Sequence, residues 1–205
     1  MYFCRIQFTN FRFVNTLIMK KIAIFASGSG SNAENIARCF LKSEHLNIEC
    51  IYSNNADAFV LTRAKNLNIP TFVFNRDEFY NSEIVLDSLK KYDIDLIVLA
   101  GFMWLVPDYL VKNFTIVNIH PALLPKFGGK GMYGERVHKA VVESGETHTG
   151  ITIHYVNEKY DEGQIIFQAD CPVLPGDSPY DVAAKVHELE YEHYPKIIER
   201  LLIRN

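Results

Sequence analysis

Residues 118–125 read Asn-Ile-His-Pro-Ala-Leu-Leu-Pro and follow the triplet Thr-Ile-Val at 115–117. The triplet predicts a short buried strand, so we expect Asn118 and His120 to stand where that strand ends. Side chains two positions apart in an extended segment point the same way, which places the amide and the imidazole on one face. Two prolines stiffen the turn that follows. This pattern suits two hydrogen-bond donors aimed at an oxygen that gains negative charge.

Strand and helix patterns alternate on both sides of this stretch. Apolar runs predict strands at 21–26, 48–53, 71–74, 96–100, 150–156 and 164–169. Helical spacing of apolar residues predicts helices at 32–41, 60–67, 83–91, 136–144 and 178–202. Such alternation on short connections predicts an α/β fold, with one doubly wound, mostly parallel sheet, helices on both faces and a Rossmann-like first half. We expect this domain to run over 19–205, with residues 1–18 as an N-terminal extension outside it.

Composition narrows the functional class. The chain has 205 residues, 48% of them hydrophobic, which is enough for one domain with a real core. A net charge of -3 offers no basic surface for nucleic acid. The cysteines (Cys4, Cys39, Cys50 and Cys171) lack metal-site or disulfide spacing, which fits a reducing cytoplasm. No apolar run approaches the ~20 residues that cross a bilayer. Oligomeric state is left open.

A Gly/Ser loop, 27–32, joins the first predicted strand to the first predicted helix. Backbone N–H groups at such a helix start favour an anion, and glycine allows close approach. The loop also fits the dinucleotide pattern G-x-G-x-x-A, which leaves a Rossmann dehydrogenase as an alternative. That alternative expects an acidic residue at the end of the second strand, where the sequence reads Tyr52-Ser53-Asn54. A plain turn capped by Ser31 or Asn32 would also explain the loop.

The motif Asn-x-His-Pro-x-Leu-Leu-Pro, taken with the Gly/Ser loop, resembles the folate-dependent formyltransferases. The resemblance covers roughly residues 19–202, and it points to the branch that acts on 5-phosphoribosylglycinamide in purine synthesis. It implies transfer of a formyl group from 10-formyltetrahydrofolate, the co-substrate, to the amine of that ribonucleotide. It implies small-molecule substrates and no metal, and the sequence shows no cluster with metal-ligand spacing.

The resemblance also assigns the site residues. It assigns catalysis to Asn118, His120 and Asp161; substrate phosphate and ribose binding to Gly30, Ser31, Asn32 and Glu190; folate binding to Met103, Trp104, Leu105, Val106 and Asn118; and a supporting role to His154. Asn118 and His120 would stabilise the oxyanion, with His120 as proton donor. Asp161 would relay protons through water and, as a carboxylate near an imidazole, raise the pKa of His120. Many relatives carry a basic residue where Trp104 stands, so the glutamate tail of the folate is expected to be held differently here. Relatives also carry a basic residue near the loop before the fourth helix, and Arg76, which is nearby, does not match it cleanly.

Other interpretations remain at this point. A methionyl-tRNA formyltransferase is expected to carry a further C-terminal domain and a basic face. A formyltetrahydrofolate hydrolase is expected to carry an N-terminal regulatory domain and to lack His-Pro after the catalytic Asn-x. A non-catalytic sugar-phosphate sensor could use the same scaffold. The loop 126–131 either closes over substrate or is an ordinary surface loop. His138, His148 and His187 are predicted to be surface residues or local helix partners.

Overall fold

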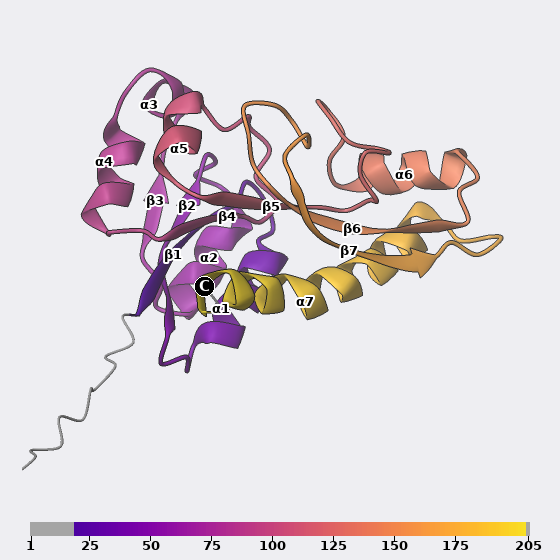
Figure 1. The fold of residues 1–205 in the computed structure, drawn as a ribbon, viewed down its shortest axis with the longest axis horizontal. Coiled ribbons are helices and arrows are strands. Elements are labelled where there is room, and N and C mark those ends of the chain that lie inside the picture. The colour runs from indigo at the N-terminus through magenta and orange to yellow at the C-terminus, as the bar shows by residue number, and fades with distance from the viewer. Residues whose placement is uncertain (1–18, 204–205) are drawn as a thin grey trace, which may run out of the picture.

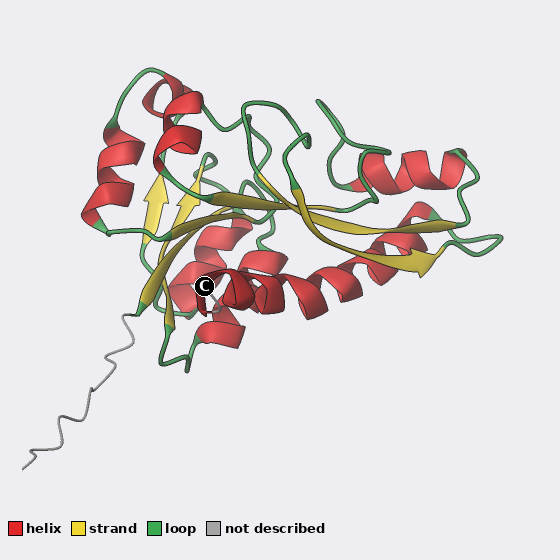
Figure 2. Cartoon of the chain, viewed as in Figure 1, coloured by secondary structure: helices red, strands yellow, loops and turns green. Residues whose placement is uncertain are grey.

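The computed structural model describes residues 19–203, which build one seven-stranded sheet in the order β3-β2-β1-β4-β5-β6-β7 (Figures 1 and 2). The strands are β1 Lys20–Phe25, β2 Leu46–Ser53, β3 Thr71–Val73, β4 Leu96–Leu99, β5 Ile116–His120, β6 His148–Tyr155 and β7 Ile165–Pro172. The first five run parallel, whereas β6 pairs antiparallel with β5 and β7 pairs antiparallel with β6. The predicted mostly parallel α/β sheet is confirmed.

Helices cover both faces of this sheet. They are α1 Ser31–Phe40, α2 Phe59–Asn66, α3 Arg76–Tyr80, α4 Ile84–Lys91, α5 Asp108–Asn113, α6 Glu135–Glu143 and α7 Pro179–Ile203. Figure 1 shows α3, α4 and α5 on one side of the parallel strands and α1, α2 and α7 on the other. The sixth helix packs against α7 at the end of the sheet that carries β6 and β7.

The alternating side chains of the central strands explain the two layers. On β1, Ile22 and Ile24 face the core formed with α1, α2 and α7, whereas Ala23 and Phe25 face the core formed with α3, α4 and α5. All four are at most 1% exposed. A strand buried on both faces reads as a continuous apolar run, as this one does. The carboxyl ends of β1, β4 and β5 therefore meet at one edge of a rigid sheet, where ligands bind in open α/β folds.

One local prediction changes, and two helices were not predicted. Strand β5 extends through His120, because Asn118 and His120 pair with His154 and Thr152 of β6 instead of lying beyond a strand end. Neither α3 nor α5 was predicted. The first starts at a capping box formed by Asn75 and Glu78, a signal that the sequence does carry. The predicted extension, residues 1–18, lies outside the described residues.

Candidate active site

A pocket of about 490 Å³ opens at the carboxyl ends of the parallel strands. Its walls come from the loops after β1, β4 and β5, from the β6–β7 connection and from α6 and α7. The predicted site residues Gly30, Ser31, Asn32, Met103, Trp104, Leu105, Val106, Asn118, His120, His154, Asp161 and Glu190 all line it. Residues up to 160 positions apart in sequence thus share one cavity of the size that holds a small molecule.

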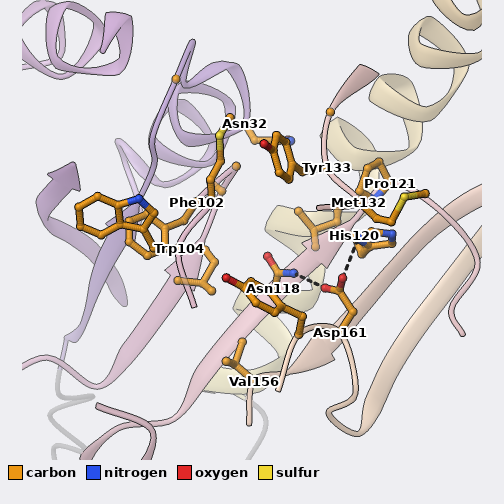
Figure 3. A pocket seen from close by; sticks show the side chains of 18 of the residues that line it. Asn32, Phe102, Trp104, Asn118, His120, Pro121, Met132, Tyr133, Val156 and Asp161 are labelled. Carbon is orange, nitrogen blue, oxygen red and sulfur yellow. Dashed lines mark hydrogen bonds and ion pairs between the residues drawn. The ribbon is translucent and has the colours of Figure 1, made fainter. Parts of the chain in front are cut away.

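Asn118 lies at the centre of a polar cluster on the pocket floor. Its Nδ2 lies 3.1 Å from Nε2 of His154 and 3.5 Å from Oδ1 of Asp161. The other His154 nitrogen, Nδ1, donates to the Tyr155 carbonyl at 2.8 Å, which leaves Nε2 to accept from the amide. The amide of Asn118 is therefore held with its N–H groups toward the carboxylate (Figure 3).

His120 is held from both sides of its ring. Nε2 donates to the Phe127 carbonyl at 2.8 Å, and Nδ1 faces Oδ2 of Asp161 at 3.5 Å. The same Asp161 oxygen accepts the backbone N–H of Gly129 at 2.9 Å. Backbone atoms of the 126–131 loop thus contact both members of the pair. The side chain of His120 is only 4% exposed and that of Asp161 11%, so their interaction is weakly screened.

The electrostatics correct one expectation. Burial lowers the pKa of His120 below its ordinary 6.5, and the opposing effects of Asp161 and the Phe127 carbonyl do not restore it. Asp161 does raise the pKa of His120 as predicted, but the predicted net rise is wrong, because desolvation of a buried imidazolium outweighs one carboxylate at 3.5 Å. Burial pushes the pKa of Asp161 upward, but the nearby rings of His154 and His120 and the Gly129 backbone N–H together lower it. At neutral pH the pair is a neutral imidazole beside a carboxylate.

The proline turn after His120 is fixed from β6 and β7. The hydroxyl of Thr152 donates to the Ala122 carbonyl at 2.7 Å and accepts the N–H of Leu124 at 2.9 Å. Gln168 of β7 donates to the Leu124 carbonyl and to the Thr152 hydroxyl. Thr152 is fully buried, so this network holds the segment that follows His120 in one conformation.

The Gly/Ser loop ends at an α1 N-terminus without a side-chain cap. Gly30 is the N-cap, in the left-handed region with φ +73°, so the interpretation that Ser31 or Asn32 caps the helix is wrong. A Cβ at Gly30 would meet the side chain of Val60 and approach its Cα to 2.8 Å. Glycine is therefore required by packing against α2, in addition to the close approach expected of a phosphate loop. Arg63 donates to the Ser29 carbonyl at 2.9 Å and so secures the loop from outside.

Glu190 of α7 is only 4% exposed and is anchored by two neighbours. Its Oε2 accepts from Nδ2 of Asn32 at 2.9 Å and from Nδ1 of His187 at 2.8 Å. The hydrogen bond to Glu190 raises the pKa of His187 above its ordinary value. A buried carboxylate beside the Gly/Ser loop is therefore oriented toward the pocket by both α1 and its own helix.

The apolar wall follows β4 and is bordered by aromatic side chains. Trp104 lies near Phe74, Phe79 and Tyr80, with ring centroids 5.8–6.2 Å apart. Figure 3 shows Trp104 and Phe102 on the side of the pocket away from His120. The exposed Arg76 guanidinium lies 5.1 Å from the Tyr80 ring centre and 5.7 Å from that of Trp104.

Sequence reasoning missed two histidines of the pocket. His138 is 2% exposed and His187 is half-exposed, and both line the cavity. For His138 the prediction of a surface or local helical role is wrong, because it lies on the buried side of α6 beside Val137. Its position next to Val137 and three before Val141, both apolar, was the available signal. His187 lies three positions before Glu190, a spacing that brings helical side chains together.

Two negative findings on residues 19–203 concern membrane proteins and metalloproteins. No helix in this range is long and apolar enough to cross a membrane. Within the same range, no group of three or more histidine, cysteine, aspartate or glutamate side chains is arranged to hold a metal ion.

Comparison with known proteins identifies the family of the chain. A family profile described as formyl transferase matches residues 20–198. The chain belongs to the formyl transferase family. A phosphoribosylglycinamide formyltransferase from Haemophilus influenzae is 40% identical over 188 residues, which are 88% of this chain and 86% of that protein. The chloroplastic protein of the same name from Arabidopsis thaliana is 42% identical over 87% of this chain.

The extent of these matches differs between relatives. This chain spans 64% of the Arabidopsis thaliana protein and 62% of the corresponding Vigna unguiculata protein, less than two thirds of either. Among solved structures, a phosphoribosylglycinamide formyltransferase from Anaplasma phagocytophilum superposes with a TM-score of 0.81 at 35% identity. That match covers 89% of this chain and 86% of the other. The sheet is therefore that of a formyl transferase.

Proposed function

We propose that this formyl transferase moves the formyl group of 10-formyltetrahydrofolate to the amine of 5-phosphoribosylglycinamide, a step of purine synthesis. The observation that carries the proposal is the convergence of Asn118, His120 and Asp161 in one pocket with an uncapped helix start at Gly30. These three side chains are suited to acyl transfer, and the loop in the same cavity is suited to binding an anion. Together they match a phosphorylated amine as the acceptor.

The reaction follows from the hydrogen-bonding partners. The amine nitrogen attacks the formyl carbon, and the carbonyl oxygen becomes an oxyanion. Asn118 supplies an N–H whose hydrogen bond to Asp161 is long, at 3.5 Å, and therefore easily exchanged. The Nε2–H of His120 is bound to the Phe127 carbonyl, a weaker acceptor than an oxyanion, so the developing charge would compete for that proton.

Proton transfer completes the exchange. The new bond joins the amine nitrogen to the formyl carbon, and the bond between that carbon and N10 of the folate breaks. One proton leaves the amine and one reaches N10, so the balance requires a relay. Asp161 is ionised and can accept the amine proton directly or through water. His120, 3.5 Å away, is neutral and can take up a proton on Nδ1 beside that carboxylate.

Substrate binding uses the remaining walls. The backbone at Gly30, Ser31 and Asn32 would hold the phosphate, because the helix start has no side-chain cap and favours negative charge. Glu190 would accept hydrogen bonds from ribose hydroxyls. The segment Met103–Val106 would bind the folate ring, and His154 would keep Asn118 oriented. We also propose that residues 19–205 form the catalytic domain and that the protein acts in the cytoplasm on small molecules.

Ligand protection and turnover together test the proposal. Purified full-length chain is assayed for deformylated folate with both substrates present. In parallel, its melting temperature is followed against 5-phosphoribosylglycinamide, glycinamide and NAD. We expect turnover, and protection that rises with ribonucleotide concentration but is weak for glycinamide and absent for NAD. Ribonucleotide protection without turnover would favour a sugar-phosphate sensor, whereas equal protection by NAD would favour a dinucleotide-binding protein.

A further inference from the structure

Asn32, His138, His187 and Glu190 form a second polar group in the pocket, here called the α7 cluster. They come from α1, α6 and α7. The rings of His138 and His187 have their centroids 6.2 Å apart, and Glu190 accepts hydrogen bonds from Asn32 and His187. None of the four belongs to the Asn118, His120 and Asp161 cluster described above.

His138 is the member that the protein itself leaves unpaired. It is 98% buried, and neither ring nitrogen makes a hydrogen bond to any residue that the structure describes. Its Nδ1 is enclosed by protein, which leaves Nε2 as the nitrogen that a ligand in the pocket can reach. Buried polar side chains are nearly always hydrogen-bonded, because an unmet donor or acceptor costs free energy. The exception here lies in the wall of a ligand pocket, which suggests that the partner is a ligand.

The cluster presents mainly hydrogen-bond acceptors. Both hydrogen bonds to Glu190 go to Oε2, so Oε1 has no partner within residues 19–203. Burial, with His187 nearby, lowers the pKa of His138, so its ring is neutral with one donor and one acceptor. The matching ligand group donates several hydrogen bonds and carries no negative charge beside Glu190. Adjacent hydroxyls on a sugar meet both requirements.

Position along the pocket supports the same ligand group. Asn32 follows the helix start at Gly30 and Ser31 that would receive the phosphate, and His138 and His120 line the same pocket. In a phosphorylated sugar amine, the sugar separates the phosphate from the reacting nitrogen. Side chains between the phosphate loop and the Asn118 cluster therefore meet the sugar.

We propose that His138 is a specificity-determining residue that hydrogen-bonds a hydroxyl of the substrate's sugar, acting together with Glu190. The inference rests on the proposed function in taking that sugar to be the ribose of 5-phosphoribosylglycinamide. The imidazole selects a sugar with its hydroxyls intact over a deoxy sugar, because the deoxy sugar leaves Nε2 of His138 unpaired.

Calorimetric binding of ribose 5-phosphate and of its 2-deoxy and 3-deoxy analogues tests this directly. It is measured on the full chain and on the variants His138→Phe, His138→Asn and His148→Ala. His148 is exposed and lies outside the pocket, so it controls for loss of a histidine. We expect His138→Phe to weaken ribose 5-phosphate about tenfold and to leave at least one deoxy sugar unaffected. His138→Asn should restore part of the preference, and His148→Ala should match the unaltered protein.

Several outcomes would overturn the inference. Equal weakening of all three sugars by His138→Phe would show a structural role only, as would unchanged binding of all three. Failure of the unaltered protein to bind any of the sugars would also overturn it. Should the phenylalanine variant not fold, His138→Ala takes its place in the same comparison. The measurement involves no turnover, so an intact sugar preference in a chain that transfers no formyl group would overturn the proposed reaction and leave the role of His138 standing.

Discussion

Nδ1 of His120 lies 3.5 Å from Oδ2 of Asp161, while the other ring nitrogen is bound to the Phe127 carbonyl. The ring is thus fixed between a carboxylate and a peptide carbonyl, with its pKa below the ordinary value. An imidazole in this setting holds one proton at neutral pH and has a charged partner ready for a second.

Removing either proposed oxyanion donor should lower turnover far more than substrate affinity. For Asn118→Ala and for His120→Ala, we expect kcat to fall about 100- to 1000-fold, the usual effect of one lost donor. Binding of 5-phosphoribosylglycinamide, measured by calorimetry, should change little, because neither side chain belongs to the phosphate wall. Near-normal kcat in both variants would rule out the mechanism.

Replacing Asp161 with asparagine should lower the pKa of His120 further. The carboxylate is the main influence that raises this pKa against burial, and the amide removes its charge while keeping its shape. NMR titration of the His120 ring against pH measures the change, with Glu162→Gln on the same loop as a matched control. An unchanged pKa would show that Asp161 has no electrostatic effect on His120, and its remaining role would be to relay protons through water.

Protein stability should fall as the pH drops below neutrality. The pKa values of His120 and His138 are lowered from 6.5 in the folded chain, so the unfolded chain binds more protons below about that pH. Each such histidine can contribute a slope of up to about 1.4 kcal/mol per pH unit. His187 acts oppositely, because its pKa is raised and its stabilisation is present at low pH and lost as pH rises.

Melting temperatures at pH 7.5 and pH 5.5 check the sign. The drop on acidification should be smaller for His138→Phe than for the unaltered protein and larger for His187→Gln. Identical drops in all three proteins would mean that these side chains are not titrating differently in the folded and unfolded states.

Gly30→Ala should destabilise the fold. The new Cβ would collide with Val60, and alanine disfavours φ +73°. Strain of both kinds together is expected to cost about 2 kcal/mol or more of unfolding free energy, measured by denaturant titration. The matched control is Gly28→Ala, where no heavy atom lies within 4 Å of the added Cβ. A Gly30 variant as stable as the Gly28 variant would contradict this account.

Arg76→Met should weaken folates that carry a glutamate tail more than folates without one. Arg76 is exposed and stacks beside Trp104, so an ion pair with the tail is screened by solvent. Exposed ion pairs contribute at most about 1 kcal/mol, so we expect a loss of no more than about fivefold. Fluorescence quenching of Trp104, the only tryptophan of the chain, reports binding of both ligands. Equal loss for both would show that the arginine acts through packing.

The centre of the sheet was predictable because β1 and β4 contain apolar runs buried on both faces. The short helices were not predicted, since five or six residues show too little periodicity to separate from a turn. The alternation at Asn118 and His120 correctly predicted a shared face, but not that β5 continues through both. Pairing with β6 decides that, and pairing partners cannot be read from the strand alone.

The sequence could not predict the direction of pKa shifts or the contacts between residues that are distant along the chain. Asp161 and His120 could be named as a pair from the resemblance, but the sign of the His120 shift depends on how much protein surrounds the ring. The same applies to Gly30, whose need to be glycine comes from Val60, 30 positions away. His138 was missed because its place on a helix does not show that the buried side of that helix lines a pocket.

The hydrogen bond between His120 and the Phe127 carbonyl bears on hydrolysis of the formyl donor in the proposed reaction. While it persists, the imidazole's one proton is committed to the protein's own backbone. In the proposed reaction any nucleophile that attacks the formyl carbon, water included, has to generate enough oxyanion charge to draw that proton away from Phe127. The hydrogen bond therefore favours neither nucleophile, and the proposed discrimination against water falls to the side chains that position the amine.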